Sequence, residues 1–242
     1  METIKDKNTI FLTDWFKIWA LAGIIFIVFL GLYTWNNKHS IHSELVYLIQ
    51  GSVFLAAAYL ALLKAGVNIK AAISDVDITD DIKLVFKYFL VYLLLGLAIL
   101  LLITIAWILL IKTNIFTSDD FYRHMKNPLD RISEQNYLHD VIMKSSFKFA
   151  VYSFSAYILI PIEEEIFFRR LLFVSLRKKM AFLPSLLISS LFFALLHGAG
   201  AGFALATGLF LGWVYEKKQK LSVNIMIHGI VNFSVDVIRQ VI

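Results

Sequence analysis

Several side chains capable of acid–base chemistry stand inside stretches of the sequence that are otherwise apolar. Glu164 lies in the segment PIEEEIFFRRLLF, and His197 ends a second apolar run. His228 and Asn232 interrupt a third run. A glutamate and a histidine held together at low dielectric can polarise a water molecule as a general base. A second histidine and an asparagine amide can donate hydrogen bonds to the oxyanion of a tetrahedral intermediate. This set of side chains indicates hydrolysis of an acyl bond without a nucleophile from the protein.

The same side chains allow a second chemistry, in which a metal ion activates the water. Glu164, His197 and His228 could hold a zinc ion that lowers the pKa of its bound water. Spacing along the sequence does not decide between the metal-free mechanism and the zinc mechanism, so the cofactor stays open.

Each polar group also has a structural explanation. Glu165 and Arg169 are four residues apart, so they could form an ion pair that neutralises itself. His197 precedes Gly198 and could cap a helix end. The pair His228 and Asn232, also four apart, could join neighbouring helices in a bilayer. Two further charged residues are expected to pack or pair structurally: Glu163 and Arg170. Polar contacts that only join helices, however, do not require a cluster rich in both acids and imidazoles.

The composition shows where these groups must work. Hydrophobic residues make up 59% of the 242 residues and charged residues only 17%, against about 45–50% and about 25% in a soluble domain. The mean hydropathy is +0.74. These values exclude a soluble enzyme, a disordered chain and a DNA-binding domain despite the net charge of +5. They predict an all-α, polytopic transmembrane helix bundle that forms a single integral membrane domain over 1–242. The absence of cysteine excludes thiol catalysis and disulfides.

The apolar runs predict about seven spans, at about 15–35, 45–63, 84–111, 146–176, 183–197, 201–216 and 221–241. The fifth and sixth runs are short, so we expect them to be tucked among neighbours or to stop part-way near a cavity. Pro161 could kink or split the fourth run. The polar segment 112–145 could contain an amphipathic helix at the membrane interface.

The distribution of Lys and Arg predicts a cytoplasmic N-terminus and an outer C-terminus. Basic clusters at 177–179 and 217–220 then mark the cytoplasmic edge. With a rise of about 1.5 Å per residue, Glu164 and His197 lie roughly 20 Å from that edge and Asn232 roughly 18 Å from it. Three separate spans therefore bring their polar groups to one level of the membrane.

Other intramembrane protease chemistries lack their motifs here. The sequence has no H-E-x-x-H zinc motif, no G-x-G-D string and no serine in a G-x-S-G setting.

Three motifs in order resemble those of the CPBP family, which comprises type II CAAX prenyl endopeptidases and bacteriocin-processing or Abi-type membrane proteases. The motifs are E-E-x-x-x-R, F-x-x-x-H and H-x-x-x-N, carried by Glu164, Glu165, Arg169, Phe193, His197, His228 and Asn232. The resemblance covers about residues 160–235. One departure is Arg170, which stands where a glycine commonly follows the motif arginine.

The resemblance implies a bundle around a cavity open to the cytoplasmic side and laterally to lipid, with a catalytic part at about 146–242. It assigns the activation of water to Glu164 and His197, and the oxyanion to His228 and Asn232. Two further side chains would orient the site: Glu165 and Arg169. The family carries the name metalloprotease, and a metal-free glutamate mechanism is a serious alternative.

The leading hypothesis is therefore an intramembrane endopeptidase of a bacterial cell membrane, acting on a membrane-associated peptide or protein. Bacteriocin precursors and peptide pheromones suit it better than prenylated proteins. A non-catalytic immunity or scaffold protein could use the same cluster for binding, and a proton-coupled transporter is a third class. No nucleic-acid partner is expected, because no soluble basic face exists.

Overall fold

The computed structural model describes residues 4, 7–36, 43–68, 76–113 and 145–241. All regular elements in these ranges are helical, which confirms the all-α bundle. The long ones are α1 (Leu12–Asn36), α2 (Ser43–Lys64), α4 (Ile78–Lys112) and α12 (Leu221–Val241). Among the described residues, these four are long and apolar enough to cross a membrane. Most of the predicted amphipathic segment at 112–145 lies outside the described residues.

The fourth apolar run forms one helical path with two π-helical segments. It comprises α7 (Ser146–Phe154), η1 (Ser155–Leu159), α8 (Ile160–Glu165), η2 (Ile166–Phe173) and α9 (Val174–Arg177). Pro161 lies in the first turn of α8, directly after a π-helical segment. In the widened π-helical turn the Pro161 ring does not clash with the carbonyl of the preceding turn, so the helix continues through the proline. Wide turns of this kind often mark functional sites, and here they flank the acidic motif on both sides.

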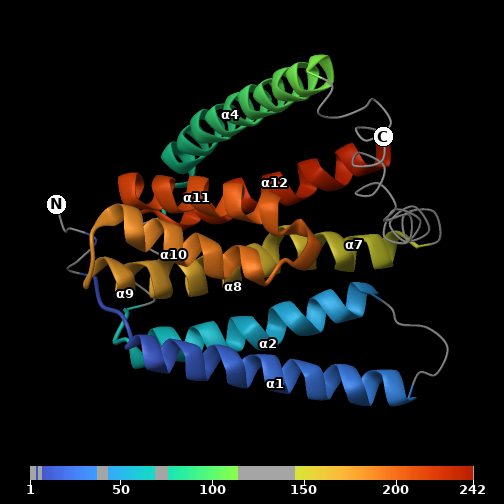
Figure 1. Ribbon diagram of the computed structural model, residues 1–242. Helices are drawn as coiled ribbons and strands as arrows, with labels where there is room; N and C mark the ends of the chain where they lie inside the picture. The colour runs from blue at the N-terminus through green and yellow to red at the C-terminus, as the bar shows by residue number, and fades with distance from the viewer. Residues whose placement is uncertain (1–3, 5–6, 37–42, 69–75, 114–144, 242) are drawn as a thin grey trace.

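The fifth and sixth runs form a hairpin that does not cross the bundle. Helix α10 (Phe182–Leu195) leads into the 3-10 turn η3 (Gly198–Gly200), and α11 (Ala201–Lys218) returns. The prediction that these short runs stop part-way is confirmed. The tip of the hairpin, the turn at 196–200 between α10 and α11, ends short of the edge that the C-terminal end of α12 reaches (Figure 1), and Leu196 in this turn is exposed.

One end of the bundle, here called the basic edge, carries Lys64, Arg177, Lys217, Lys218 and Lys220. Ion pairs join neighbouring helices there. Arg177 contacts Glu216 at 2.9 Å, and Lys220 pairs with the buried Asp81 of α4. The hydrogen bond and the charge of Asp81 raise the pKa of Lys220 above its ordinary value. Helices α1, α10 and α12 all begin at this edge, and the C-terminal end of α12 lies at the opposite edge (Figure 1).

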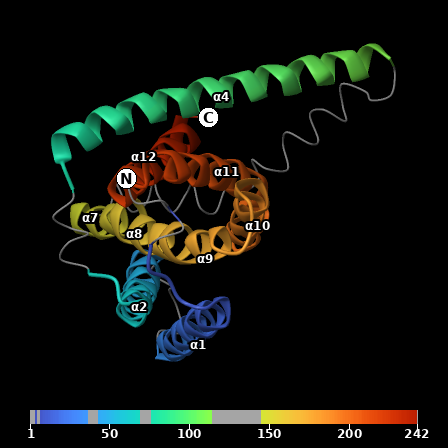
Figure 2. The same ribbon diagram turned by 90° about the vertical axis from the view of Figure 1, so that its left-hand side faces the viewer.

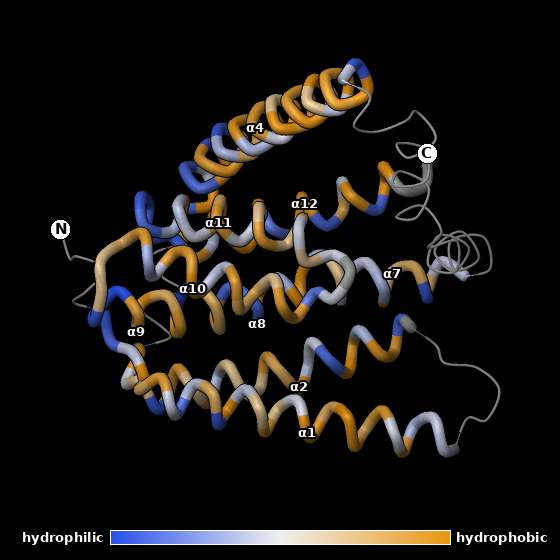
Figure 3. The backbone as a smooth tube through the Cα atoms, viewed as in Figure 1, coloured by the Kyte–Doolittle hydropathy of each residue, from blue (hydrophilic) through white to orange (hydrophobic). Residues whose placement is uncertain are grey.

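Helix α4 packs on the rest of the bundle through its first half only. Tyr88 and Tyr92 contact rings of α11, and the Tyr92 hydroxyl lies 2.9 Å from that of Thr207. Beyond these contacts most apolar side chains of α4 are exposed, and the helix leans away from the bundle (Figure 2). The residues of α4 are hydrophobic along most of the helix (Figure 3). This half of α4 is expected to face lipid.

The core that supports the acidic motif is aromatic. Trp15 is almost fully buried and donates from Nε1 to the carbonyl of Phe167 at 2.9 Å. Its ring lies edge-on to Phe167 and Phe168. The bond satisfies a carbonyl of the π-helical segment η2, so α1 fixes the stretch that follows the three glutamates.

Candidate active site

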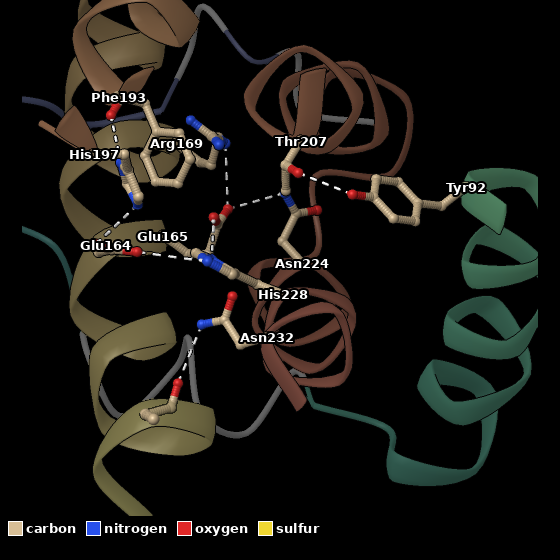
Figure 4. A network of polar contacts seen from close by, with 11 residues as sticks. Tyr92, Glu164, Glu165, Arg169, Phe193, His197, Thr207, Asn224, His228 and Asn232 are labelled. Carbon is tan, nitrogen blue, oxygen red and sulfur yellow. Dashed lines mark hydrogen bonds and ion pairs between the residues drawn. The ribbon is translucent and has the colours of Figure 1, made fainter. Parts of the chain in front are cut away.

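Three elements bring the predicted side chains together, as Figure 4 shows. Glu164 lies near the end of α8, His197 at the tip of the hairpin and His228 in the middle of α12. The Oε1 atom of Glu164 lies 3.9 Å from Nε2 of His197, and Oε2 lies 3.5 Å from Nε2 of His228. One carboxylate therefore stands between the rings of two histidines from two other elements.

His197 is oriented by its own helix. Its Nδ1 atom lies 2.7 Å from the carbonyl oxygen of Phe193, and its ring packs on the Phe193 ring at 4.4 Å between centroids. Because a carbonyl oxygen only accepts, Nδ1 carries the hydrogen. The Nε2 atom of the neutral ring is then a hydrogen-bond acceptor and faces Glu164.

Glu165 forms a second, fully buried cluster behind the first. Its Oε1 atom accepts from Nδ1 of His228 at 3.0 Å, while its Oε2 atom lies 3.3 Å from Nε of Arg169. The guanidinium of Arg169 stacks over the Phe193 ring at 5.0 Å. The predicted pair of Glu165 and Arg169 is therefore present, and it also holds His228 with Nε2 turned towards Glu164. The carboxylate orients the imidazole through the nitrogen that faces away from the site.

Asn232 lies one turn beyond His228 on α12. Its Nδ2 atom donates to the carbonyl of Ala156 at 3.1 Å, and its side chain also lines the cavity described below. An amide nitrogen has two hydrogens, so one remains for a ligand. Arg170, which is expected to pack or pair structurally, donates to the carbonyl of Asn8. Phe168, four residues after Glu164, is almost fully buried against Phe193.

One side chain of this cluster, Asn224, is missing from the sequence prediction. It is fully buried and donates to Oε2 of Glu165 at 3.1 Å and to the carbonyl of Leu211 at 2.8 Å. A signal for it exists, because α12 carries polar residues at every fourth position: Asn224, His228, Asn232 and Asp236. This period places all of them on one face of the helix.

A cavity of about 540 Å³ lies over these groups. Its lining includes Glu164, His197, His228 and Asn232 and extends to Asp236, near the edge opposite to the basic edge. None of the residues that define the basic edge lines it. The lining does not show on which side of a membrane the cavity opens, so the opening towards the cytoplasmic side stays a prediction. The hairpin fills the half of the bundle next to the basic edge, and its tip forms the floor of the cavity.

The cavity also reaches the outer surface of the bundle. Leu196 and Phe203, on either side of the hairpin tip, line it and are 47% and 51% exposed. Residues of both α1 and α12 line the cavity, among them Phe26 and Val235. This geometry is consistent with the expected access from lipid.

The described residues do not form a set of ligands around one metal position. Within the described ranges, no group of three or more His, Asp or Glu side chains is placed to hold an ion. Glu164 lies near both histidines, but its oxygens are directed to them separately, at 3.9 Å and 3.5 Å. We therefore derive no step through a metal.

The fold and the site together define a helical membrane protein with a Glu–His cluster at the base of a cavity. A family model described as type II CAAX prenyl endopeptidase Rce1-like matches residues 146–234. The matched stretch begins at α7 and ends within α12, so it contains Glu164, His197, His228 and Asn232. The match confirms the predicted relationship to the CPBP family of intramembrane proteases for this part of the chain. It supports an intramembrane CAAX-type protease in general. Neither a curated protein nor a solved structure matches the chain.

Proposed function

We propose that the chain is an intramembrane endopeptidase that hydrolyses a peptide bond in a membrane-associated peptide or protein. The observation that carries the proposal is the position of the Glu164 carboxylate between Nε2 of His197 and Nε2 of His228, at the base of the cavity. Charged and imidazole groups inside a bilayer are costly, and their concentration at one point favours a catalytic use.

Glu164 and His197 are the proposed activators of water. The 3.9 Å between their facing atoms is too long for a direct hydrogen bond but can be bridged by a water that donates one hydrogen to each. As the water oxygen attacks the carbonyl carbon, Glu164 accepts its proton. Glu164 then returns the proton to the amide nitrogen, the C–N bond breaks, and the products are a carboxylic acid and an amine.

His228 and Asn232 are the proposed donors to the oxyanion. Because Nδ1 of His228 is bonded to Glu165, its Nε2 donates when the ring is the imidazolium form, whose charge the Glu165 carboxylate stabilises. Asn232 contributes the amide hydrogen that Ala156 does not use. Two further side chains act as positioning residues behind them: Glu165 and Arg169.

For the biological setting we propose a bacterial cell membrane with the N-terminus in the cytoplasm, because the basic edge carries the positive charges that favour that side. The cavity then lies in the outer half of the bundle. Small membrane peptides such as bacteriocin precursors or pheromones suit access from lipid.

The test compares the purified full-length protein with Glu164→Gln and His197→Ala on quenched membrane peptides in lipid nanodiscs. Removing a general base lowers the rate by about 10²–10⁴-fold. Asp80→Asn is the matched control, because Asp80 is an exposed carboxylate that pairs with Lys83 at the surface. If either site variant inserts, folds and cleaves as the control does, the protease proposal fails and a binding role takes its place.

A further inference from the structure

The cavity contains a carboxyl group that the proposed mechanism does not use. Glu163 is only 3% exposed and lines the cavity next to the catalytic groups. Within the described part of the chain, it has neither a hydrogen bond nor an ion pair. Successive residues of a helix are turned by about 100°, so Glu163 occupies a different face of α8 from Glu164. It therefore borders the cavity beside the Glu–His cluster without joining it.

The outer end of the same cavity carries another carboxylate, Asp236. Its Oδ2 atom accepts from the hydroxyls of Tyr152 and Tyr157 at 2.8 Å and 3.0 Å. Tyr152 also lines the cavity, as does the amide side chain of Gln50. This half of the wall thus offers hydrogen-bond acceptors at two depths, Glu163 near the floor and Asp236 near the outer end.

The described lining contains the carboxyl groups of Glu163, Glu164 and Asp236, the imidazoles of His197 and His228, and no lysine or arginine. Glu164 faces both imidazoles, whereas Glu163 faces no basic group among the described residues. A carboxyl group buried without a partner is costly in a bilayer unless a cation approaches it. A cleft lined by one sign of charge also concentrates ligands of the opposite sign. The part of the cavity beside Glu163 is therefore suited to a cationic group.

We propose that Glu163 forms the floor of a subsite for a cationic side chain of the peptide substrate, with Asp236 attracting the same charge at the outer end. This proposal rests on the proposed function. Neighbouring Cα atoms are about 3.8 Å apart, so Glu163 is close to the reacting carbonyl at Glu164. The lysine or arginine that it binds lies within one or two residues of the scissile bond.

The subsite also defines the kind of cleavage. A substrate whose C-terminal carboxylate entered the cavity would pass the carboxyl groups of Asp236 and Glu163 before it reached the imidazoles of His197 and His228. A cationic, membrane-associated peptide cut at an internal bond meets complementary charge instead. The structure thus favours internal cleavage of cationic peptides.

The first arm of the test measures binding in a form that does not depend on cleavage. In the Glu164→Gln background, two fluorescent apolar peptides of about 20 residues are titrated in nanodiscs, one with a central lysine and one with norleucine there. Norleucine keeps the carbon chain and lacks the amine. A charge-assisted hydrogen bond predicts about 10- to 100-fold tighter binding of the lysine peptide.

The second arm adds Glu163→Gln to the same background, with Asp80→Asn as the matched control. The preference for lysine should disappear with Glu163→Gln and persist with Asp80→Asn. The substitution is isosteric and removes no observed contact, so the protein should fold. Equal binding of the two peptides, or a preference that survives Glu163→Gln, overturns the subsite.

Cleavage by the protein with Glu164 intact separates this proposal from the proposed function. If both peptides are cut at equal rates, the endopeptidase stands and the subsite fails. If neither is cut but the lysine preference depends on Glu163, the subsite stands and the catalytic role of Glu164 fails.

Discussion

Replacing Asn224 by alanine tests whether the cluster behind the catalytic groups positions them. The change removes two buried hydrogen bonds, one to the Glu165 carboxylate and one to the carbonyl of Leu211. Hydrogen bonds between helices in bilayers contribute about 0.6–2 kcal/mol each, so the loss of both lowers the free energy of unfolding by about 1–4 kcal/mol. Glu165 keeps its contacts with His228 and Arg169, so the bundle should still form.

Asn224→Ala should lower activity by more than its loss of stability alone would explain. Glu165 orients His228, and removing a partner of such an orienting group typically lowers activity by about 10–100-fold. We expect kcat to fall while KM stays the same, because Asn224 is not among the residues that line the cavity. The assay combines steady-state cleavage of a quenched peptide with thermal unfolding of the same preparation.

Ser234→Ala is the matched control on the same helix. Ser234 is a small polar residue of α12 whose hydroxyl donates to the carbonyl of Ile230, and it does not line the cavity. It should change neither kcat nor the unfolding midpoint. A kcat for Asn224→Ala equal to that of the control would refute the positioning role of the cluster.

Three further predictions concern packing, the attachment of α4 and the metal. Gly229→Ala should lower the free energy of unfolding by about 1–3 kcal/mol, because the new Cβ would meet the carbonyl oxygen of Tyr157. Gly23→Ala is the control, since its Cβ meets nothing within 4 Å. Equal midpoints of thermal unfolding for the two variants would contradict the close crossing of α12 and η1. Asp81→Asn should lower the midpoint of thermal unfolding, because it removes the ion pair with Lys220. The difference from the native protein should be constant below the ordinary lysine pKa and vanish as pH rises through the raised pKa of Lys220. A difference that grows with pH would disprove the pair of Asp81 and Lys220. Cleavage should persist after treatment with a strong chelator, and activity that is lost and then restored by added zinc would replace the metal-free mechanism.

The membrane bundle could be predicted from the sequence because its signals are local. Each long apolar run matches a helix, and the shortness of the runs at 183–197 and 201–216 indicates the hairpin. The meeting of Glu164, His197 and His228 could be predicted because helix rise converts residue number into depth. The contact between Glu165 and Arg169 follows from their spacing of four residues.

The extent of the cavity and the role of Asn224 could not be predicted in the same way. The residues that line the cavity come from several elements, among them α1, α2, α8, α12 and the hairpin, and their meeting is a property of packing between elements far apart in the sequence. Asn224 stands only four residues before His228, but an asparagine in a span has several structural uses. Its importance comes from Glu165, which lies on another helix.

The most direct measurement of the central claim is mass spectrometry of membrane peptides from cells that make either the native protein or Glu164→Gln in equal amounts. The account predicts an intact precursor that accumulates in the variant. The native protein should yield two fragments whose summed mass equals that of the precursor plus one water. Identical peptide profiles, with both proteins inserted and folded, would contradict the claim that Glu164 activates water for peptide hydrolysis.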